Sequence, residues 1–268
     1  MDRELLLHIP HASVSIPAAY RGDFTVPLDE EVRNMTDWYT DALFDLPAAR
    51  LVFPISRLVC DAERFRDDAS EEMARRGMGV CYTHGCRGTR IRRLTDARRE
   101  EILRTWYDPH HRALESLTAA ALRRHGRCLI VDCHSFSARP LPYEADQRAD
   151  RPDICIGTDP FHTPDALAAL LAEAFARRGY SVAFNAPYAG SIVPLRSYRA
   201  DRRVLSVMIE VNRGLYLGGD CRPAPSFARV RSDIAGALGA LEGRLPDLTA
   251  QNFVPGGQVP LAIPEKLC

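Results

Sequence analysis

Three apolar runs in the chain each end beside ionisable side chains, and this feature restricts the fold more than any other. The runs are Leu5–Ile9, Cys128–Val131 and Val204–Ile209. Short continuous apolar runs are typical of strands that are buried on both faces of a sheet. Open α/β sheets carry their chemistry just beyond the carboxyl ends of their strands. The three runs therefore predict a functional site at one edge of such a sheet.

The strand-like runs alternate with stretches that have helical spacing of their apolar residues. Helices are predicted within 27–44, 96–125, 163–179 and 225–242. This alternation predicts one α/β domain, three layers thick, over residues 1–248. A polar, glycine-containing loop at 66–95 is of the kind that borders active sites, and the tail 249–268 is predicted to be irregular.

Composition restricts the class of partner and the compartment. The chain has 35 basic and 35 acidic residues, which argues against nucleic acid or an anionic membrane as a partner. Its start lacks the features of a signal peptide, and we expect a cytoplasmic protein. The eight cysteines are then expected to be reduced thiols. A local cluster of Cys81, His84 and Cys86 is the alternative, but no second cysteine pair lies at zinc-finger spacing.

Histidines near two strand ends are candidate metal ligands. His11 lies in the turn after Pro10 and is a better candidate than His8, which is still in the strand and is expected to be packed in the core. Asp132 and His134 share one face of their strand, so that Asp132 can orient the His134 ring. The alternative is a polar pair that only caps the following loop.

Further acids and arginines flank these histidines in the sequence. Asp37 lies near a predicted helix start and is a third candidate ligand, although a solvated helix face is the usual explanation for such an acid. Arg57 and Arg64 flank Asp61 and have the geometry to bind a substrate carboxylate, or they form salt bridges with that acid.

Glu210 is an acid within an otherwise apolar strand. A buried carboxylate is costly unless it has a partner or a chemical role, and a general base beside a metal-bound water is one such role. Pairing with Arg213 is the alternative.

Together these residues resemble the motifs of the N-formylglutamate amidohydrolase family. The matching segments follow the family's order over about residues 5–217: Pro10–Ser13 with Ile16-Pro17, Thr36–Trp38, Ser56–Arg64, Asp132–Ser135, Asn185–Gly190 and Ile209-Glu210. Tyr107, Pro109 and His111 match a further Tyr-x-Pro-x-His pattern. A single motif of this kind is weak, whereas six in order are specific.

The resemblance implies a zinc-exopeptidase-like fold, related to zinc carboxypeptidases and aspartoacylases, with a mixed, mostly parallel sheet between helical layers. It also implies a zinc ion, or another divalent metal, that activates water to cleave the amide of an acidic N-acyl amino acid. The implied roles are metal ligation by His11, Asp37 and His134, proton transfer by Glu210, and substrate binding or carbonyl polarisation by Arg57 and Arg64, with Asn185, Gly190 and His111 around the pocket.

One segment departs from the family pattern. Formylglutamate enzymes tend to have Asp-Leu-Asn-Arg where this chain has Asp61-Ala62-Glu63-Arg64. The additional acid, Glu63, weakens the binding of a dicarboxylate by like-charge repulsion. Two alternatives to an N-acyl amino acid hydrolase therefore stay open, a metal-dependent peptidase or cell-wall amidase and a non-catalytic binding protein of the same fold. The sequence does not specify an oligomeric state.

Overall fold

The computed structural model describes residues 4–241 and 244 and contains one six-stranded sheet. The strands are β1 (Leu5–Ile9), β2 (Ala49–Val52), β3 (Cys128–Phe136), β4 (Ile154–Gly157), β5 (Val182–Phe184) and β6 (Val204–Asn212). Their order across the sheet is β2-β1-β3-β6-β4-β5. β2, β1, β3 and β6 are parallel, whereas β4 runs antiparallel to β6 and parallel to β5. The predicted mixed, mostly parallel sheet is confirmed.

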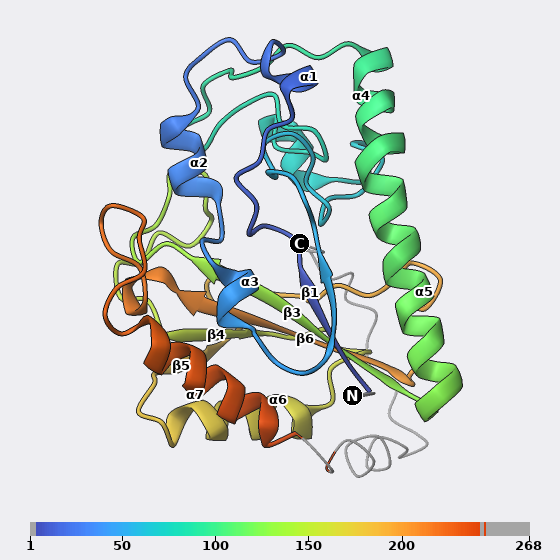
Figure 1. Cartoon of the computed structure of the whole chain (residues 1–268), viewed down its shortest axis with the longest axis vertical. Coiled ribbons are helices and arrows are strands. Elements are labelled where there is room, and N and C mark those ends of the chain that lie inside the picture. Colours follow the sequence, from blue (N-terminus) through green and yellow to red (C-terminus); the bar gives the residue numbers. More distant parts are fainter. Residues whose placement is uncertain (1–3, 242–243, 245–268) are drawn as a thin grey trace.

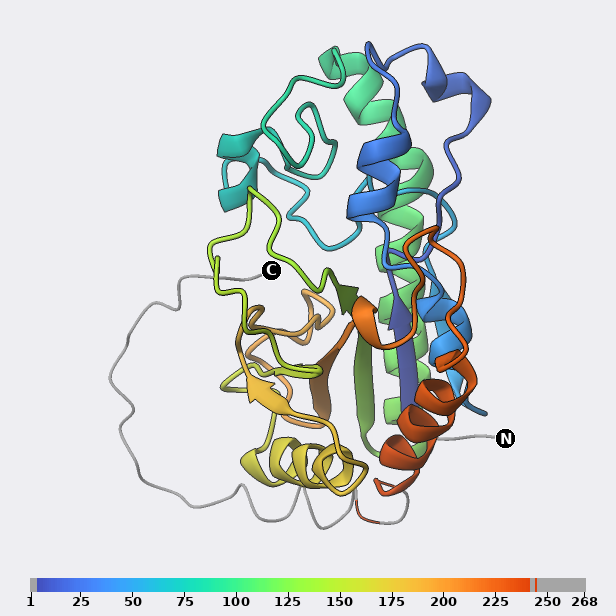
Figure 2. The same cartoon turned by 90° about the vertical axis from the view of Figure 1, so that its left-hand side faces the viewer.

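Helices cover both faces of the sheet (Figures 1 and 2). The helices are α1 (Ala18–Arg21), α2 (Asp29–Met35), α3 (Thr40–Leu43), α4 (Asp96–Ile102), α5 (Asp108–His125), α6 (Asp165–Ala176) and α7 (Phe227–Gly239), with 3₁₀ turns at Glu72–Arg76 and Arg213–Leu215. α5 packs on one face, against β1, β2 and β3, whereas α6 and α7 pack together on the other. The three-layer α/β architecture is therefore as predicted.

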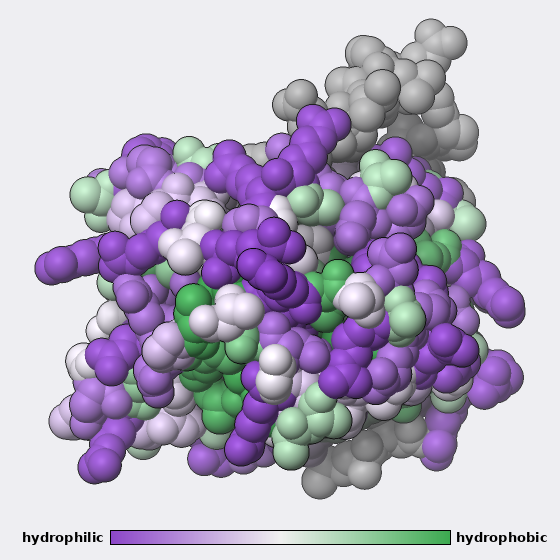
Figure 3. Space-filling model, turned by 90° about the horizontal axis from the view of Figure 1, so that it is seen from above, coloured by the Kyte–Doolittle hydropathy of each residue, from purple (hydrophilic) through white to green (hydrophobic). Residues whose placement is uncertain are grey.

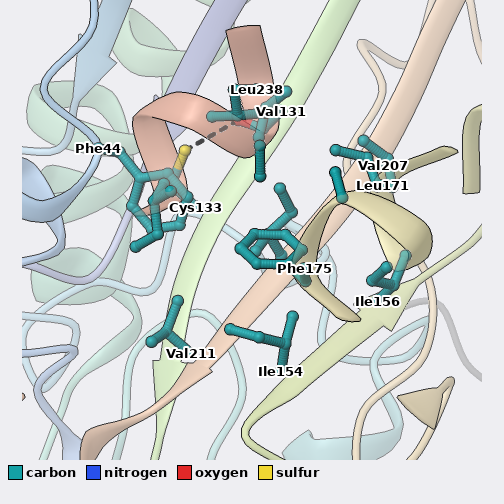
Figure 4. Packing of buried hydrophobic residues seen from close by; sticks show 14 of the residues in the cluster. Phe44, Val131, Cys133, Ile154, Ile156, Leu171, Phe175, Val207, Val211 and Leu238 are labelled. Carbon is teal, nitrogen blue, oxygen red and sulfur yellow. Dashed lines mark hydrogen bonds between the residues drawn. The ribbon is translucent and has the colours of Figure 1, made fainter. Parts of the chain in front are cut away.

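The alternation of side chains along the central strands separates the core from the site. In β3, Leu129, Val131 and Cys133 point into the main core beneath α6 and α7, as Figure 4 shows for the last two. Asp132 and His134 have the opposite orientation, because neighbouring residues of a strand project to opposite faces. β6 repeats the pattern in register, with Ile209 in the core and Glu210 opposite His134.

Above the carboxyl edge of the sheet, segments from the first 107 residues form a second packed region (Figures 1 and 2). Its centre is a separate apolar cluster that includes Phe53, Val59, Ile102 and Leu103. Viewed from above, this region is largely hydrophilic, with hydrophobic residues visible only in separate small areas (Figure 3). The region places the loop that carries Arg57 to Arg64 directly over the sheet edge.

Asp29 and Pro109 each lie at the start of a helix. Asp29 is the first residue of α2, and Leu28 occupies its N-cap position. The helical stretch from Asp96 to His125 is interrupted by a π-helical turn at Leu103–Tyr107, which ends two residues before Pro109. Proline lacks a backbone N–H, so the helix accommodates it at the start of α5 after this wider turn.

The described part of the chain contains no helix that is long and apolar enough to cross a membrane. The single-domain interpretation of residues 1–248 remains a prediction. The predicted irregular tail at 249–268 lies outside the described residues.

Candidate metal centre and active site

The sheet edge brings together His11, Asp37 and His134, the three residues predicted as metal ligands. One possible ligand atom from each lies within 4.8 Å of the other two, and all three residues are buried. His134 Nδ1 is 3.0 Å from an Asp37 carboxylate oxygen, and His11 Nδ1 is 3.6 Å from the same oxygen. His11 follows β1, His134 is on β3, and Asp37 lies in the turn between α2 and α3.

The donor atoms of this group fit a divalent cation. His11 Nδ1 is buried and has no hydrogen-bond partner within the described residues. Buried polar atoms are rarely left without a partner unless a ligand supplies one. Two imidazoles and one carboxylate are also a donor set that zinc accepts.

Asp61 is fully buried and joins this group to the predicted substrate-binding arginines. One of its oxygens accepts hydrogen bonds from His11 Nε2 at 2.8 Å and from the backbone N–H of Glu63 at 3.0 Å. The other accepts from Arg57 at 2.8 Å and from the Tyr82 hydroxyl at 2.7 Å. Burial opposes ionisation of Asp61, but the Arg57 charge and His11 hold its pKa well below the usual value.

Arg57 and Arg64 line a cavity of about 160 Å³ together with His11, Asp37, His134 and Glu210. Arg57 uses Nε and one terminal nitrogen for Asp61, and Arg64 Nε donates to the carbonyl of Met78. These hydrogen bonds hold both arginine side chains in position where they line the cavity. The salt-bridge and substrate-binding interpretations of these arginines are compatible with one another.

Glu210 is buried beside the histidines, opposite His134 in the register of β3 and β6. Its Oε2 atom has no hydrogen-bond partner among the described residues. The alternative partner, Arg213, instead donates to the backbone carbonyls of Asn34 and Thr36, both at 3.0 Å. Burial raises the pKa of Glu210 from 4.5 to about 8 in the absence of a cation.

This pKa predicts how the stability of the metal-free protein depends on pH. Between pH 4.5 and about 8, the folded protein keeps a proton on Glu210 that the unfolded chain has released. The free energy of unfolding therefore falls as pH rises through this window, and the Glu210 contribution is constant above it. Glu210→Gln carries no such proton, so this part of the decline is expected to be absent from the variant.

Urea unfolding of both proteins at several pH values, with a chelator present, measures the difference. The stability of Glu210→Gln relative to the original chain should increase from pH 5 to pH 8. Parallel pH profiles of the two proteins would contradict the raised pKa.

The Tyr-x-Pro-x-His residues hold the loop above the site. The Tyr107 hydroxyl donates to the backbone carbonyl of Arg64 at 2.8 Å, and His111 Nε2 donates to that of Ala62 at 2.9 Å. Burial lowers the pKa of His111 to about 4, so the ring is neutral near pH 7. His111 lines a smaller neighbouring cavity, on the other side of Glu63 and Arg64, and its role in substrate binding remains a prediction.

Asn185 and Gly190 lie at the two ends of a loop whose middle residues, Pro187 to Ala189, line the main cavity. The Asn185 side chain binds the backbone N–H and hydroxyl of Thr158 rather than facing the cavity. Gly190 has φ +93°, a conformation that favours glycine. A Cβ at Gly157 would lie 2.4 Å from the Gly190 carbonyl oxygen, so this loop packs closely on β4. The two residues shape the loop, and direct substrate contact remains a prediction.

Sequence reasoning did not assign a site role to His8, His110 or Glu63. His8 is fully buried, as expected of a core histidine, but its Nδ1 is 2.8 Å from Asp132 and its Nε2 is 2.9 Å from His110 Nε2. Glu63, the acid that departs from the family motif, lies 3.1 Å from His134 Nε2. The departure itself was the available signal for Glu63, whereas nothing in the sequence pairs His8 with His110.

Comparison with known proteins agrees with the motifs. The family model described as FGase, N-formylglutamate amidohydrolase, matches residues 3–217. The chain belongs to this family. Membership of this family identifies the protein as an amidohydrolase. No curated protein matches the chain.

Two solved structures are similar to this family member. The first is the crystal structure of an N-formylglutamate amidohydrolase from Ralstonia eutropha JMP134, with 25% identity and a TM-score of 0.78, covering 92% of this chain and 94% of that one. The second is a gene product from Agrobacterium tumefaciens, with 20% identity, a TM-score of 0.65, and coverage of 89% and 92%. The second similarity concerns the fold alone.

Proposed function

We propose that the protein is a divalent-metal-dependent hydrolase that cleaves the amide bond of an acidic N-formyl or other N-acyl amino acid, with N-formylglutamate as the reference substrate. The supporting observation is the buried group of His11, Asp37 and His134, with Glu210 beside it and two arginines in the same cavity. The name of the similar enzyme from Ralstonia supports the choice of substrate.

His11, Asp37 and His134 would hold the cation, which supplies Lewis acidity and lowers the pKa of water. Asp61 fixes the His11 ring through Nε2, which leaves Nδ1 directed toward Asp37. Asp132 lies within ion-pair distance of the His134 ring, 3.1 Å from Nε2. Burial opposes ionisation of Asp37, but hydrogen bonds from His11 and His134 lower its pKa, which keeps it an anion at neutral pH.

Glu210 accepts a proton from the attacking water and later delivers it to the leaving amine. The water oxygen bonds to the acyl carbon, the C–N bond breaks, and a carboxylic acid and an amino acid are released. A positive charge in the neighbouring ligand group favours the Glu210 carboxylate, because opposite charge lowers the pKa of an acid.

Arg57 and Arg64 bind the substrate's oxygen atoms. A guanidinium group presents several N–H donors to a carboxylate or to a developing oxyanion, and Asp61 keeps both groups in position. Because both arginines share the single carboxylate of Asp61, the pair retains net positive charge. That charge attracts a substrate carboxylate, whereas Glu63 in the same cavity opposes a second one.

Removal of the metal should abolish hydrolysis. Purified protein is expected to release formate from N-formylglutamate, to lose this activity after dialysis against a chelator, and to recover it when Zn²⁺ is added. N-acetylglutamate and short neutral peptides are the comparison substrates. Full activity of the metal-free protein would contradict the metal, and turnover confined to peptides would contradict the substrate class.

A further inference from the structure

Glu63 and Asp132 are two buried carboxylates whose basic partners in the described structure are all imidazoles. The Glu63 side chain is 7% exposed, and its oxygens lie 3.1 Å from His134, 3.6 Å from His8 and 3.9 Å from His11. Asp132 is 2% exposed and lies 2.8 Å from His8 and 3.1 Å from His134. Neither acid has an arginine partner there, in contrast to Asp61.

Two carboxylates in one buried space are unfavourable unless positive charge or hydrogen-bond donors face them. The two acids also lie beside the first proposed metal centre, since both approach His134 Nε2 to 3.1 Å. A second ion next to that centre rests on the proposed function.

The atoms around the two acids are arranged as a second set of ligands. Nδ1 of His8 and one oxygen each from Glu63 and Asp132 lie within 4.8 Å of one another. Glu63 Oε1, which approaches His8, is buried and has no hydrogen-bond partner among the described residues. It is therefore a donor atom that points into the group without a ligand of its own.

His110 prepares His8 for such a role. The two Nε2 atoms are 2.9 Å apart, so one of them must donate a proton to the other. If His8 donates from Nε2, its Nδ1 lone pair faces Glu63 and Asp132. The fully buried His8 ring is fixed by this contact and by its position in β1, where it pairs with Asp132 of β3.

The geometry points to a second divalent-cation site, formed by His8, Glu63 and Asp132 and adjacent to the first. One nitrogen and two carboxylate oxygens form a donor set suited to Zn²⁺ or Mn²⁺. A cation there would balance the charge of the two carboxylates. His134 separates the two groups, because its Nδ1 faces Asp37 and its Nε2 faces Glu63 and Asp132.

Zinc stoichiometry of the full-length protein tests the second site. After chelator treatment and equilibrium dialysis against Zn²⁺, metal analysis should find two bound equivalents in the original chain and one in Glu63→Gln. Glu31→Gln is the matched control, because Glu31 is also a buried glutamate but binds the backbone N–H of Cys86 outside this group. The control should keep two equivalents. Both variants contain the same cysteines, so zinc bound by thiols does not affect the difference in stoichiometry between them.

Each other outcome overturns the second site. One equivalent in the original chain would refute it and leave the proposed metal-dependent hydrolase intact, whereas none would refute both. An unchanged stoichiometry in Glu63→Gln would show that Glu63 is not a ligand. Loss of both ions in that variant would assign Glu63 to the first centre. Circular dichroism of both variants establishes that they are folded.

Discussion

Glu210→Gln is expected to lower kcat for N-formylglutamate hydrolysis by about 10²–10⁴-fold, the range typical of a lost general acid–base group. The amide cannot accept the proton of the attacking water. Zinc content and KM should change little, because Glu210 is not among the proposed ligands and the substitution nearly preserves its shape. Steady-state kinetics combined with metal analysis measure all three quantities.

The fold should tolerate this substitution. Burial raises the pKa of Glu210 to about 8, so the neutral glutamine resembles the protonated form that the metal-free protein favours. Glu173→Gln is a suitable control, since Glu173 lies on α6 and pairs with Arg177 at the surface. A kcat of Glu210→Gln within about tenfold of the original would be too small a loss for a general base.

Asp61→Asn is expected to destabilise the protein by about 3–5 kcal/mol, the cost of removing one partner from a buried ion pair. The change leaves Arg57 and Arg64, whose side chains are only 12% and 10% exposed, without their shared carboxylate. It also places an amide N–H₂ group among donors from His11, Arg57 and Tyr82. Urea unfolding of the two proteins under the same metal conditions measures the difference.

Asp45→Asn gives the matched comparison at the surface. Asp45 is 46% exposed and pairs with Arg50 and Arg231, so its loss should cost about 1 kcal/mol or less. Equal stability losses in the two variants would rule out a central structural role for Asp61. Zinc affinity provides a second measurement, because loss of a hydrogen bond that orients a ligand typically weakens metal binding about 10–100-fold.

Much of the fold could be predicted because the relevant signals are local. Apolar runs marked β1, β3 and β6, and helical spacing marked α5, α6 and α7. The chemistry of the edge was also predictable in part. Residues that follow the carboxyl ends of neighbouring parallel strands must meet, and alternation along a strand places Asp132 and His134 on one side.

The hydrogen bonds that hold the site residues in position could not be predicted, because they join segments that are distant in the sequence. The Asp61 carboxylate reaches His11 across 50 residues, and His8 reaches His110 across 102 residues. The Tyr-x-Pro-x-His pattern was visible, but only the packing of α5 shows that Tyr107 and His111 bind the backbone of the loop at 62–64.

The sequence by itself determined the strands, the alternation with helices, the family and the identity of the ionisable residues at the sheet edge. Periodicity and motif order express these properties along the chain, within a few residues of each position. The tertiary structure alone decided which acid faces which imidazole, that Arg213 leaves Glu210 unpaired, and that Glu63 joins His8 and Asp132. Such pairings depend on how separate segments are placed relative to one another. A small shift of one segment is enough to make or break the contact between a buried charge and its partner.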